Sequence, residues 1–203
     1  MNLKKILILD LDGVLINSKP NMRKSLALTS KRLNIDLPFK LYEKYLGLPF
    51  EKIMKKMRII KNIKNIKKNY ENFSSKYINE IIINKKNILD LIKLKKHFYL
   101  VVFTSKSRNR TQKILKNYKI FDYTVSSDDV KRGKPNPEGL FRILNKFKLD
   151  NKDAFFIGDS IYDYRASKAA KIKYFHAKWG YQKNNFSKNI KVINRLLDIK
   201  KFI

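Results

Sequence analysis

The sequence predicts an α/β fold, in which a Rossmann-like parallel sheet carries helices on both faces and a helical domain is inserted after the first strand. Short runs of branched apolar residues, typical of strands buried on both faces, alternate with stretches whose apolar residues have helical spacing. This alternation is interrupted over 17–84, where the spacing is helical. We therefore expect an α/β core domain from 1–16 and 85–203, and a helical domain from 17–84.

The elements can be placed in chain order from these patterns and from their breaks. Within 17–84 the breaks between helices fall at Leu37-Pro38 and at Gly47-Leu48-Pro49. An aromatic stripe of Tyr70, Phe73 and Tyr77, continued by Ile81, is typical of a helix face in a core. Buried strands are expected at 5–9, 98–103, 123–125, 154–157 and 172–176. In the core domain, helices are expected at 88–97, 111–115, 138–144 and 163–170, with a closing helix at 190–199.

Length and composition limit the class of protein. A chain of 203 residues with 43% hydrophobic residues can bury one sizeable core and a smaller accessory unit. It contains no cysteine, which excludes disulfides and thiolate metal sites. No run has the length of a membrane span or the form of a targeting segment. These features predict a globular protein of the cytoplasm, without a membrane partner.

The formal charge of +30 has two explanations. Clustered Lys and Arg would indicate a nucleic-acid-binding protein, because such clusters displace counterions from phosphate backbones. Here the lysines are spread along the chain and accompany many Asn, Ile, Phe and Tyr residues, all encoded by AT-rich codons. We favour a compositional bias, with nonspecific binding of polyanions at low salt and attraction of small anionic substrates.

Two carboxylates follow the first strand. Asp10 and Asp12 are two residues apart, so along an extended chain they project to the same side. Like charges held so close are costly unless a cation lies between them or one carboxylate is protonated. Gly13 lets the chain turn sharply after them, and a simple Asp-Gly turn is the alternative explanation.

Other polar residues follow the later elements in the same way. Thr104, Lys134, Asp159 and Asp163 all fall at or just after predicted strand ends. In open parallel sheets, ligands bind beyond the carboxyl ends of the strands. If Asp10 and Asp12 only formed a turn, the positions of these later polar residues at strand ends would have no explanation. The sequence therefore predicts one polar site at this edge of the sheet.

These residues carry a resemblance to a known family. The motif Asp10-Leu11-Asp12-Gly13-Val14-Leu15 is followed in order by Thr104, by Lys134 before Pro135, and by Gly158-Asp159-Ser160 with Asp163. The chain thereby resembles, over essentially its full length, the phosphatases of the haloacid dehalogenase superfamily. Alone, Thr104-Ser105 would indicate a helix cap and Lys134 a surface lysine. Four motifs in order at strand ends are far more specific.

The resemblance implies a role for each aspartate. Asp10 would be the nucleophile that forms an aspartyl-phosphate. Asp12 would protonate the leaving oxygen and then deprotonate the hydrolytic water. This acid role requires a raised proton affinity, which we expect crowding by Asp10 to supply. Asp10, Asp159 and the backbone carbonyl of Asp12 would bind Mg²⁺, which prefers oxygen ligands.

The remaining motif residues would bind and orient the phosphoryl group. The resemblance implies that the Thr104 hydroxyl and the backbone N–H of Ser105 bind phosphoryl oxygens. Lys134 would stabilise the nucleophile and the transferring group. Asp163 would orient the metal waters or Lys134.

The helical insert matches the cap of one subgroup of the superfamily in position and size. A cap of this kind closes over the site, excludes water and selects the substrate. Gly47-Leu48-Pro49 is either a cap loop that faces the site or an ordinary turn between helices. Arg23 is either a contact for the anionic end of the substrate or a solvated charge. Asn17 stands where such relatives commonly carry an aspartate, a departure that affects the entrance to the site.

Within that subgroup, the chain is most similar to phosphoglycolate phosphatases and related pyrophosphatases. The supporting residues are Thr104-Ser105-Lys106, Gly133-Lys134-Pro135-Asn136-Pro137-Glu138 and Trp179-Gly180-Tyr181. The sequence thus predicts a Mg²⁺-dependent phosphatase of small phosphomonoesters, with phosphoglycolate as the first candidate. The alternatives are a pyrophosphatase or nucleotide phosphatase, a sugar-phosphate mutase, and a basic nucleic-acid-associated binding protein.

Overall fold

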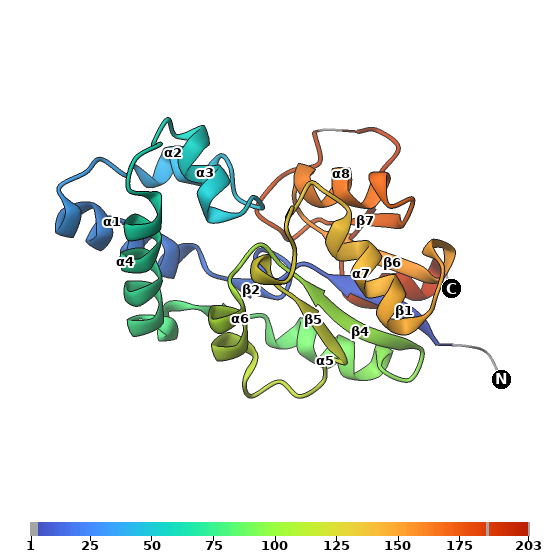
Figure 1. Ribbon diagram of the computed structural model, residues 1–203. Coiled ribbons are helices and arrows are strands. Elements are labelled where there is room, and N and C mark those ends of the chain that lie inside the picture. Colours follow the sequence, from blue (N-terminus) through green and yellow to red (C-terminus); the bar gives the residue numbers. More distant parts are fainter. Residues whose placement is uncertain (1–3, 186, 203) are drawn as a thin grey trace.

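A six-stranded parallel sheet forms the centre of the molecule (Figure 1). The computed structural model describes residues 4–185 and 187–202. The strands lie in the order β5-β4-β1-β6-β7-β8, so β1 is central and pairs with β4 and β6. Their bounds are β1 Lys5–Leu9, β4 Phe98–Phe103, β5 Tyr123–Val125, β6 Ala154–Gly158, β7 Lys173–Ala177 and β8 Lys191–Ile193.

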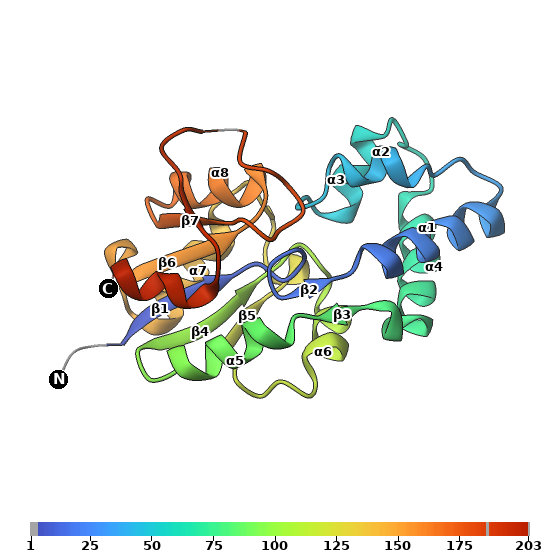
Figure 2. The same ribbon diagram turned by 180° about the vertical axis from the view of Figure 1, so that it is seen from behind.

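Helices cover both faces of this sheet, because successive strand residues point to opposite sides. Ile6 and Ile8 of β1 pack on the face covered by α7 (Glu138–Phe147) and α8 (Ile161–Ala169). Leu7 and Leu9 pack on the other face, with α5 (Lys85–Leu94), α6 (Arg108–Leu115) and the 3₁₀ helix η4 (Leu196–Phe202), which Figure 2 shows in front. The predicted α/β sheet with helices on both faces is confirmed.

Residues 19–80 form a helical unit with its own apolar core. The core includes Leu26, Met54 and Tyr70, each at most 1% exposed. Two short antiparallel strands connect this unit to the sheet, with Ile16 opposite Ile83 and Asn17 opposite Ile82. The bounds are β2 Ile16–Asn17, α1 Lys19–Leu33, α2 Phe39–Glu43, α3 Phe50–Lys56, α4 Ile63–Lys76, η1 Ile78–Glu80 and β3 Ile82–Ile83. No helix among residues 4–185 and 187–202 is long and apolar enough to cross a membrane.

The C-terminal segment differs from the expected closing helix over 190–199. It contains strand β8, which pairs with β7, and then the 3₁₀ helix η4. The β-branched residues Val192 and Ile193 favour the strand, and the exposed sheet edge beside β7 supplies its hydrogen bonds. Between the two elements, Asp198 Oδ2 accepts hydrogen bonds from the N–H groups of Asn194 and Arg195.

The expected aromatic stripe is also shorter than its spacing indicated. Helix α4 ends at Lys76, and a 3₁₀ turn separates it from Ile81. Tyr70 is buried in the core of the helical unit, as expected, but it also lines a cavity that is described below. An aromatic residue of this stripe therefore contributes both to the core and to the candidate site.

Candidate active site

Asp10 lies directly beyond the end of the central strand. Its N–H donates to the Ile157 carbonyl of β6 at 2.9 Å, and its Oδ1 accepts from the N–H of Leu11 at 2.7 Å. The side chain is buried, with 3% of the residue exposed. Gly13 then turns the chain with φ +81°, in the left-handed region that favours glycine. The predicted turn and the predicted carboxylate site therefore coexist.

Lys134 joins two of the predicted carboxylates. It lies in the loop before α7, is 1% exposed, and places its Nζ 2.9 Å from Asp10 Oδ1 and 2.7 Å from Asp163 Oδ1. Burial acts to lower the pKa of Lys134, but the two carboxylates outweigh it and hold the pKa above its ordinary value. Lys134 is therefore a fixed positive charge beside Asp10.

Asp159 and Asp163 come from the end of β6 and the first turn of α8. Asp163 Oδ2 accepts from the N–H of Ser160 at 3.0 Å and from its hydroxyl at 2.6 Å, in a capping box. With Oδ1 bound to Lys134, both carboxylate oxygens of Asp163 are engaged. Asp159 Oδ2 accepts from the N–H of Tyr181 at 2.5 Å.

Three buried carboxylates lie together in an arrangement that could bind a divalent cation. Asp10, Asp159 and Asp163 are buried, and one oxygen from each lies within 4.8 Å of the others. Burial raises the pKa of Asp10 to about 7 although Lys134 acts to lower it, and burial together with the neighbouring carboxylates raises the pKa of Asp159 well above its ordinary value. A hard cation would offset this crowding of negative charge.

The backbone also approaches the Asp159 side chain closely at two glycines. A Cβ atom at Gly13 or at Gly180 would lie 2.1 Å from an atom of the Asp159 side chain. These two glycines therefore form a narrow cradle for the carboxylate. Asp10 and Asp159 could hold a metal ion, and Asp163, whose oxygens are both engaged, positions Lys134.

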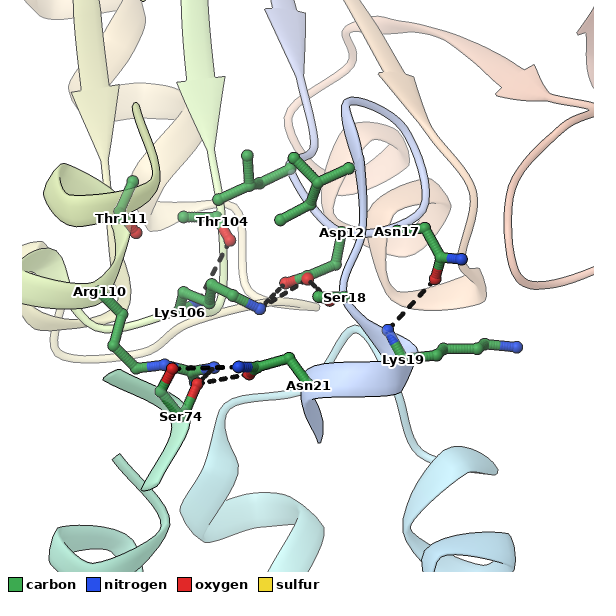
Figure 3. A network of polar contacts seen from close by, with 12 residues as sticks. Asp12, Asn17, Ser18, Lys19, Asn21, Ser74, Thr104, Lys106, Arg110 and Thr111 are labelled. Atoms are coloured by element: carbon green, nitrogen blue, oxygen red, sulfur yellow. Dashed lines mark hydrogen bonds and ion pairs between the residues drawn. The ribbon is translucent and has the colours of Figure 1, made fainter. Parts of the chain in front are cut away.

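Asp12 has a partner that the sequence analysis did not identify (Figure 3). Lys106 Nζ lies 2.6 Å from Asp12 Oδ1 and 2.7 Å from Oδ2, and the Ser18 hydroxyl also donates to Oδ1. Burial acts to raise the pKa of Asp12, but Lys106 and Ser18 outweigh it and hold the pKa below its ordinary value. The expectation that Asp10 would raise the proton affinity of Asp12 is therefore wrong for this arrangement, because Lys106 neutralises the carboxylate.

Thr104 and Ser105 connect the end of β4 to the helical unit. Thr104 is 1% exposed; its N–H donates to the Val125 carbonyl at 2.9 Å, and its Oγ1 accepts from the Lys106 N–H at 3.2 Å. The Ser105 hydroxyl donates to the Gly47 carbonyl at 2.8 Å. The loop at Gly47 therefore contacts the site rather than forming only a turn between helices.

A cavity of about 50 Å³ lies between the ends of the strands and the helical unit. Asp10, Asp12 and Asp159 line it from the sheet side, and Gly47 and Leu48 line it from the helical side. A space of this size holds only a few water-sized groups. Gly47 and Leu48 of the predicted loop thus reach the site.

Two of the expected cap residues lie outside the cavity lining. Pro49 precedes α3 and contacts the loop at Gly133, where a Cβ atom would lie 2.9 Å from its ring. Arg23 is exposed, with its guanidinium 4.9 Å from the centre of the Phe39 ring. In this conformation Arg23 is therefore a solvated charge, as the second of its two predicted roles states.

Comparison with known proteins identifies the family. Residues 7–177 match the model of the haloacid dehalogenase-like hydrolases. The chain belongs to the haloacid dehalogenase-like hydrolase family. It is 27% identical to a phosphoglycolate phosphatase of Aquifex aeolicus over 191 residues, which cover 89% of this chain and 88% of that protein. It is 29% identical to the pyrophosphatase PpaX of Bacillus velezensis over 189 residues, which cover 85% and 82%.

Solved structures agree with this assignment at the level of the fold. A haloacid dehalogenase-like hydrolase from Streptococcus pneumoniae superposes with a TM-score of 0.83 at 21% identity, covering 100% of both chains. The chain is therefore an enzyme of the haloacid dehalogenase type, and relatives that match over most of its length are phosphatases by name.

Several residues of this candidate site were not predicted from the sequence. Lys106 appeared only within a motif, although its position two residues after Thr104 was a usable signal. Ser18 was not among the predicted site residues. Tyr181 binds Asp159 through its N–H, while its hydroxyl accepts from the Ser18 N–H at 2.7 Å. Arg110, on α6, lines the cavity and carried no motif signal.

Proposed function

We propose that this haloacid dehalogenase-type hydrolase is a Mg²⁺-dependent phosphatase of small phosphomonoesters, with phosphoglycolate as the first candidate substrate. The observation that carries the proposal is the buried cluster of Asp10, Lys134, Asp159 and Asp163 at the carboxyl ends of β1 and β6. The relative named phosphoglycolate phosphatase supports the choice of first substrate. The absence of cysteine is compatible with the cytoplasmic location that we propose.

In the proposed reaction, an Asp10 carboxylate oxygen attacks the phosphorus atom while the bond from phosphorus to the ester oxygen breaks. Asp12 gives a proton to that leaving oxygen. Water then attacks the phosphorus of the aspartyl-phosphate, Asp12 takes its proton, and the bond from Asp10 to phosphorus breaks. The products are the alcohol, inorganic phosphate and the original Asp10 carboxylate.

The other residues supply charge and position. We propose that Lys134 stabilises the transferring phosphoryl group, that Thr104 and the Ser105 N–H bind its oxygens, and that Asp163 holds Lys134 in place. Mg²⁺, held by Asp10, Asp159 and the Asp12 carbonyl, would reduce the repulsion between the anionic ester and the attacking carboxylate.

The present pairing of Asp12 sets a condition on this scheme. An ion pair with Lys106 favours the ionised carboxylate, whereas a general acid must carry a proton. The proposal therefore requires that substrate binding separates Asp12 from Lys106.

We also propose that residues 17–84 act as a cap over the core of 1–16 and 85–203. The chain crosses between the two units through β2 and β3, which are paired side by side. The cap contacts the core at Gly47 through Ser105, and at Leu46 through the side-chain amide of Gln182. Because the cavity between cap and core is only about 50 Å³, we propose that the cap opens to admit a substrate larger than a few water-sized groups.

Phosphate release from a panel of esters, with Mg²⁺ or with EDTA, tests the proposal. The panel contains phosphoglycolate, pyrophosphate, nucleotides and sugar phosphates. Pyrophosphate is the second candidate because of the relative named pyrophosphatase PpaX. Metal-dependent release from phosphoglycolate is the expected result. Conversion of a sugar phosphate to its isomer, without release, would instead indicate a mutase, and no reaction with any ester would leave a binding role for the basic surface.

A further inference from the structure

Arg110 is a buried cation of the candidate site that forms no ion pair with any of the described residues. It is 8% exposed and lines the same cavity as Asp10. Among the residues that the structure describes, no carboxylate oxygen lies within 4.0 Å of its guanidinium nitrogens. A guanidinium has five N–H donors, and the described residues accept only one hydrogen bond from it, at the Ser74 hydroxyl. A buried charge in this state is costly unless an anion joins it.

The surroundings hold this guanidinium in place (Figure 3). Its Nη2 donates to Ser74 Oγ at 2.6 Å, and that hydroxyl donates to Asn21 Oδ1 at 2.6 Å. The Asn21 amide nitrogen donates in turn to the carbonyls of Ser74 and Tyr77. The Tyr70 ring lies under the guanidinium, with its centre 5.0 Å away. Arg110 is thus fixed between α6 of the core and α4 of the helical unit.

Two aspartates of the cavity form ion pairs with lysines rather than with Arg110. Asp10 pairs with Lys134, and Asp12 pairs with Lys106. Glu71, which also lines the cavity, lies beyond ion-pair distance of Arg110. Asp12 and Glu71 act on Arg110 only from beyond ion-pair distance, so N–H donors of its guanidinium can bind an anion that enters from solution, on the side of the cavity formed with the helical unit.

We propose that Arg110 is a specificity-determining residue that binds a second anionic group of the substrate, separate from the phosphoryl group that is transferred. The proposal rests on the proposed function and narrows its substrate class to small phosphate esters or anhydrides with a carboxylate or a second phosphate close to the reacting phosphorus. Arginine suits this role, because its planar fork can bind either oxyanion with two parallel hydrogen bonds.

The test compares substrates that differ only at the distal group. Phosphoglycolate carries a carboxylate where ethyl phosphate carries a methyl group, and pyrophosphate supplies the phosphate alternative. The wild-type enzyme should prefer one of the two anionic substrates over ethyl phosphate in kcat/KM. In Arg110→Gln, this preference should fall by between about 10-fold and about 100-fold, as expected for loss of a hydrogen-bonded charge pair.

Three further variants separate recognition from structure. Arg108→Gln removes a charge from the same helix outside the cavity and should keep the preference. Ser74→Ala removes one contact that holds the guanidinium and should lower the preference less than Arg110→Gln does, because the Arg110 charge and its contact with the Tyr70 ring remain. If Arg110→Gln does not fold, Arg110→Lys keeps the charge without the fork and should show a smaller loss of preference. Inhibition by phosphonoacetate, relative to methylphosphonate, should weaken in parallel in the Arg110 variants.

The outcomes distinguish the two proposals. If the wild-type enzyme hydrolyses ethyl phosphate and does not prefer either anionic substrate, the role of Arg110 is overturned while the phosphatase proposal stands. An equal loss on all three substrates in folded Arg110 variants also overturns it, because the residue would then act on the common phosphoryl group. No release from any substrate with metal would overturn the phosphatase proposal and, with it, the basis of this inference.

Discussion

Replacement of Lys134 by methionine should destabilise the protein strongly in the absence of metal. Its ammonium group lies 2.9 Å from Asp10 and 2.7 Å from Asp163, and the side chain is 1% exposed. Methionine keeps much of the volume but leaves these carboxylates and Asp159 without the buried cation. Removing one partner of a buried pair costs about 3–5 kcal/mol. For a chain of this size, about 2–4 °C per kcal/mol gives a melting temperature lower by about 6–20 °C.

Thermal unfolding in EDTA, followed by circular dichroism, measures this effect. Lys168→Met, on the exposed surface of α8, is the matched control and should shift the melting temperature by little. Mg²⁺ should recover part of the loss in Lys134→Met, because a cation at the carboxylates replaces some of the missing positive charge. A Lys134→Met variant as stable as Lys168→Met would refute the assignment of Lys134 as the charge that holds this cluster together.

Three other results should follow from the same site. Mg²⁺ at about 100 times its dissociation constant should raise the free energy of unfolding of the wild-type protein by about 2.7 kcal/mol. A melting temperature that Mg²⁺ leaves unchanged would contradict the metal site. Gly180→Ala should abolish metal-dependent phosphate release, because its Cβ would lie 2.1 Å from the Asp159 side chain. Circular dichroism should show that the variant is folded, and retained turnover would show that Asp159 can shift without loss of function. Between about 50 mM and about 200 mM salt, nonspecific binding of DNA in a filter assay should collapse while phosphate release persists, and equal losses would support a polyanion-binding role instead.

The sheet and the cluster at its edge could be predicted from the sequence because both depend on local pattern. The apolar runs of the strands and the position of Asp10 at the end of β1 follow from spacing along the chain. Lys134 and Asp163 meet at Asp10 because parallel strands bring their carboxyl ends together. These contacts need only the topology, which the alternation of strands and helices indicated.

The features that escaped prediction depend on contacts between distant segments. Lys106 neutralises Asp12 from the loop after β4, so the local argument from Asp10 gave the wrong direction for the proton affinity of Asp12. Arg110 meets Ser74 only when α6 packs beside α4. Strand β8 forms because the edge of β7 is available to it, which a helical reading of 190–199 could not take into account.

In the proposed reaction Asp10 becomes phosphorylated during turnover, and chemical trapping can detect this phosphoryl-enzyme. The enzyme is quenched in acid during turnover of its best substrate with Mg²⁺, and borohydride then reduces an aspartyl-phosphate to homoserine. Mass spectrometry of the peptide containing position 10 should show homoserine in the wild-type protein, but not in EDTA or in Asp10→Asn. Sustained phosphate release without modification at position 10, or undiminished release by Asp10→Asn, would contradict the account.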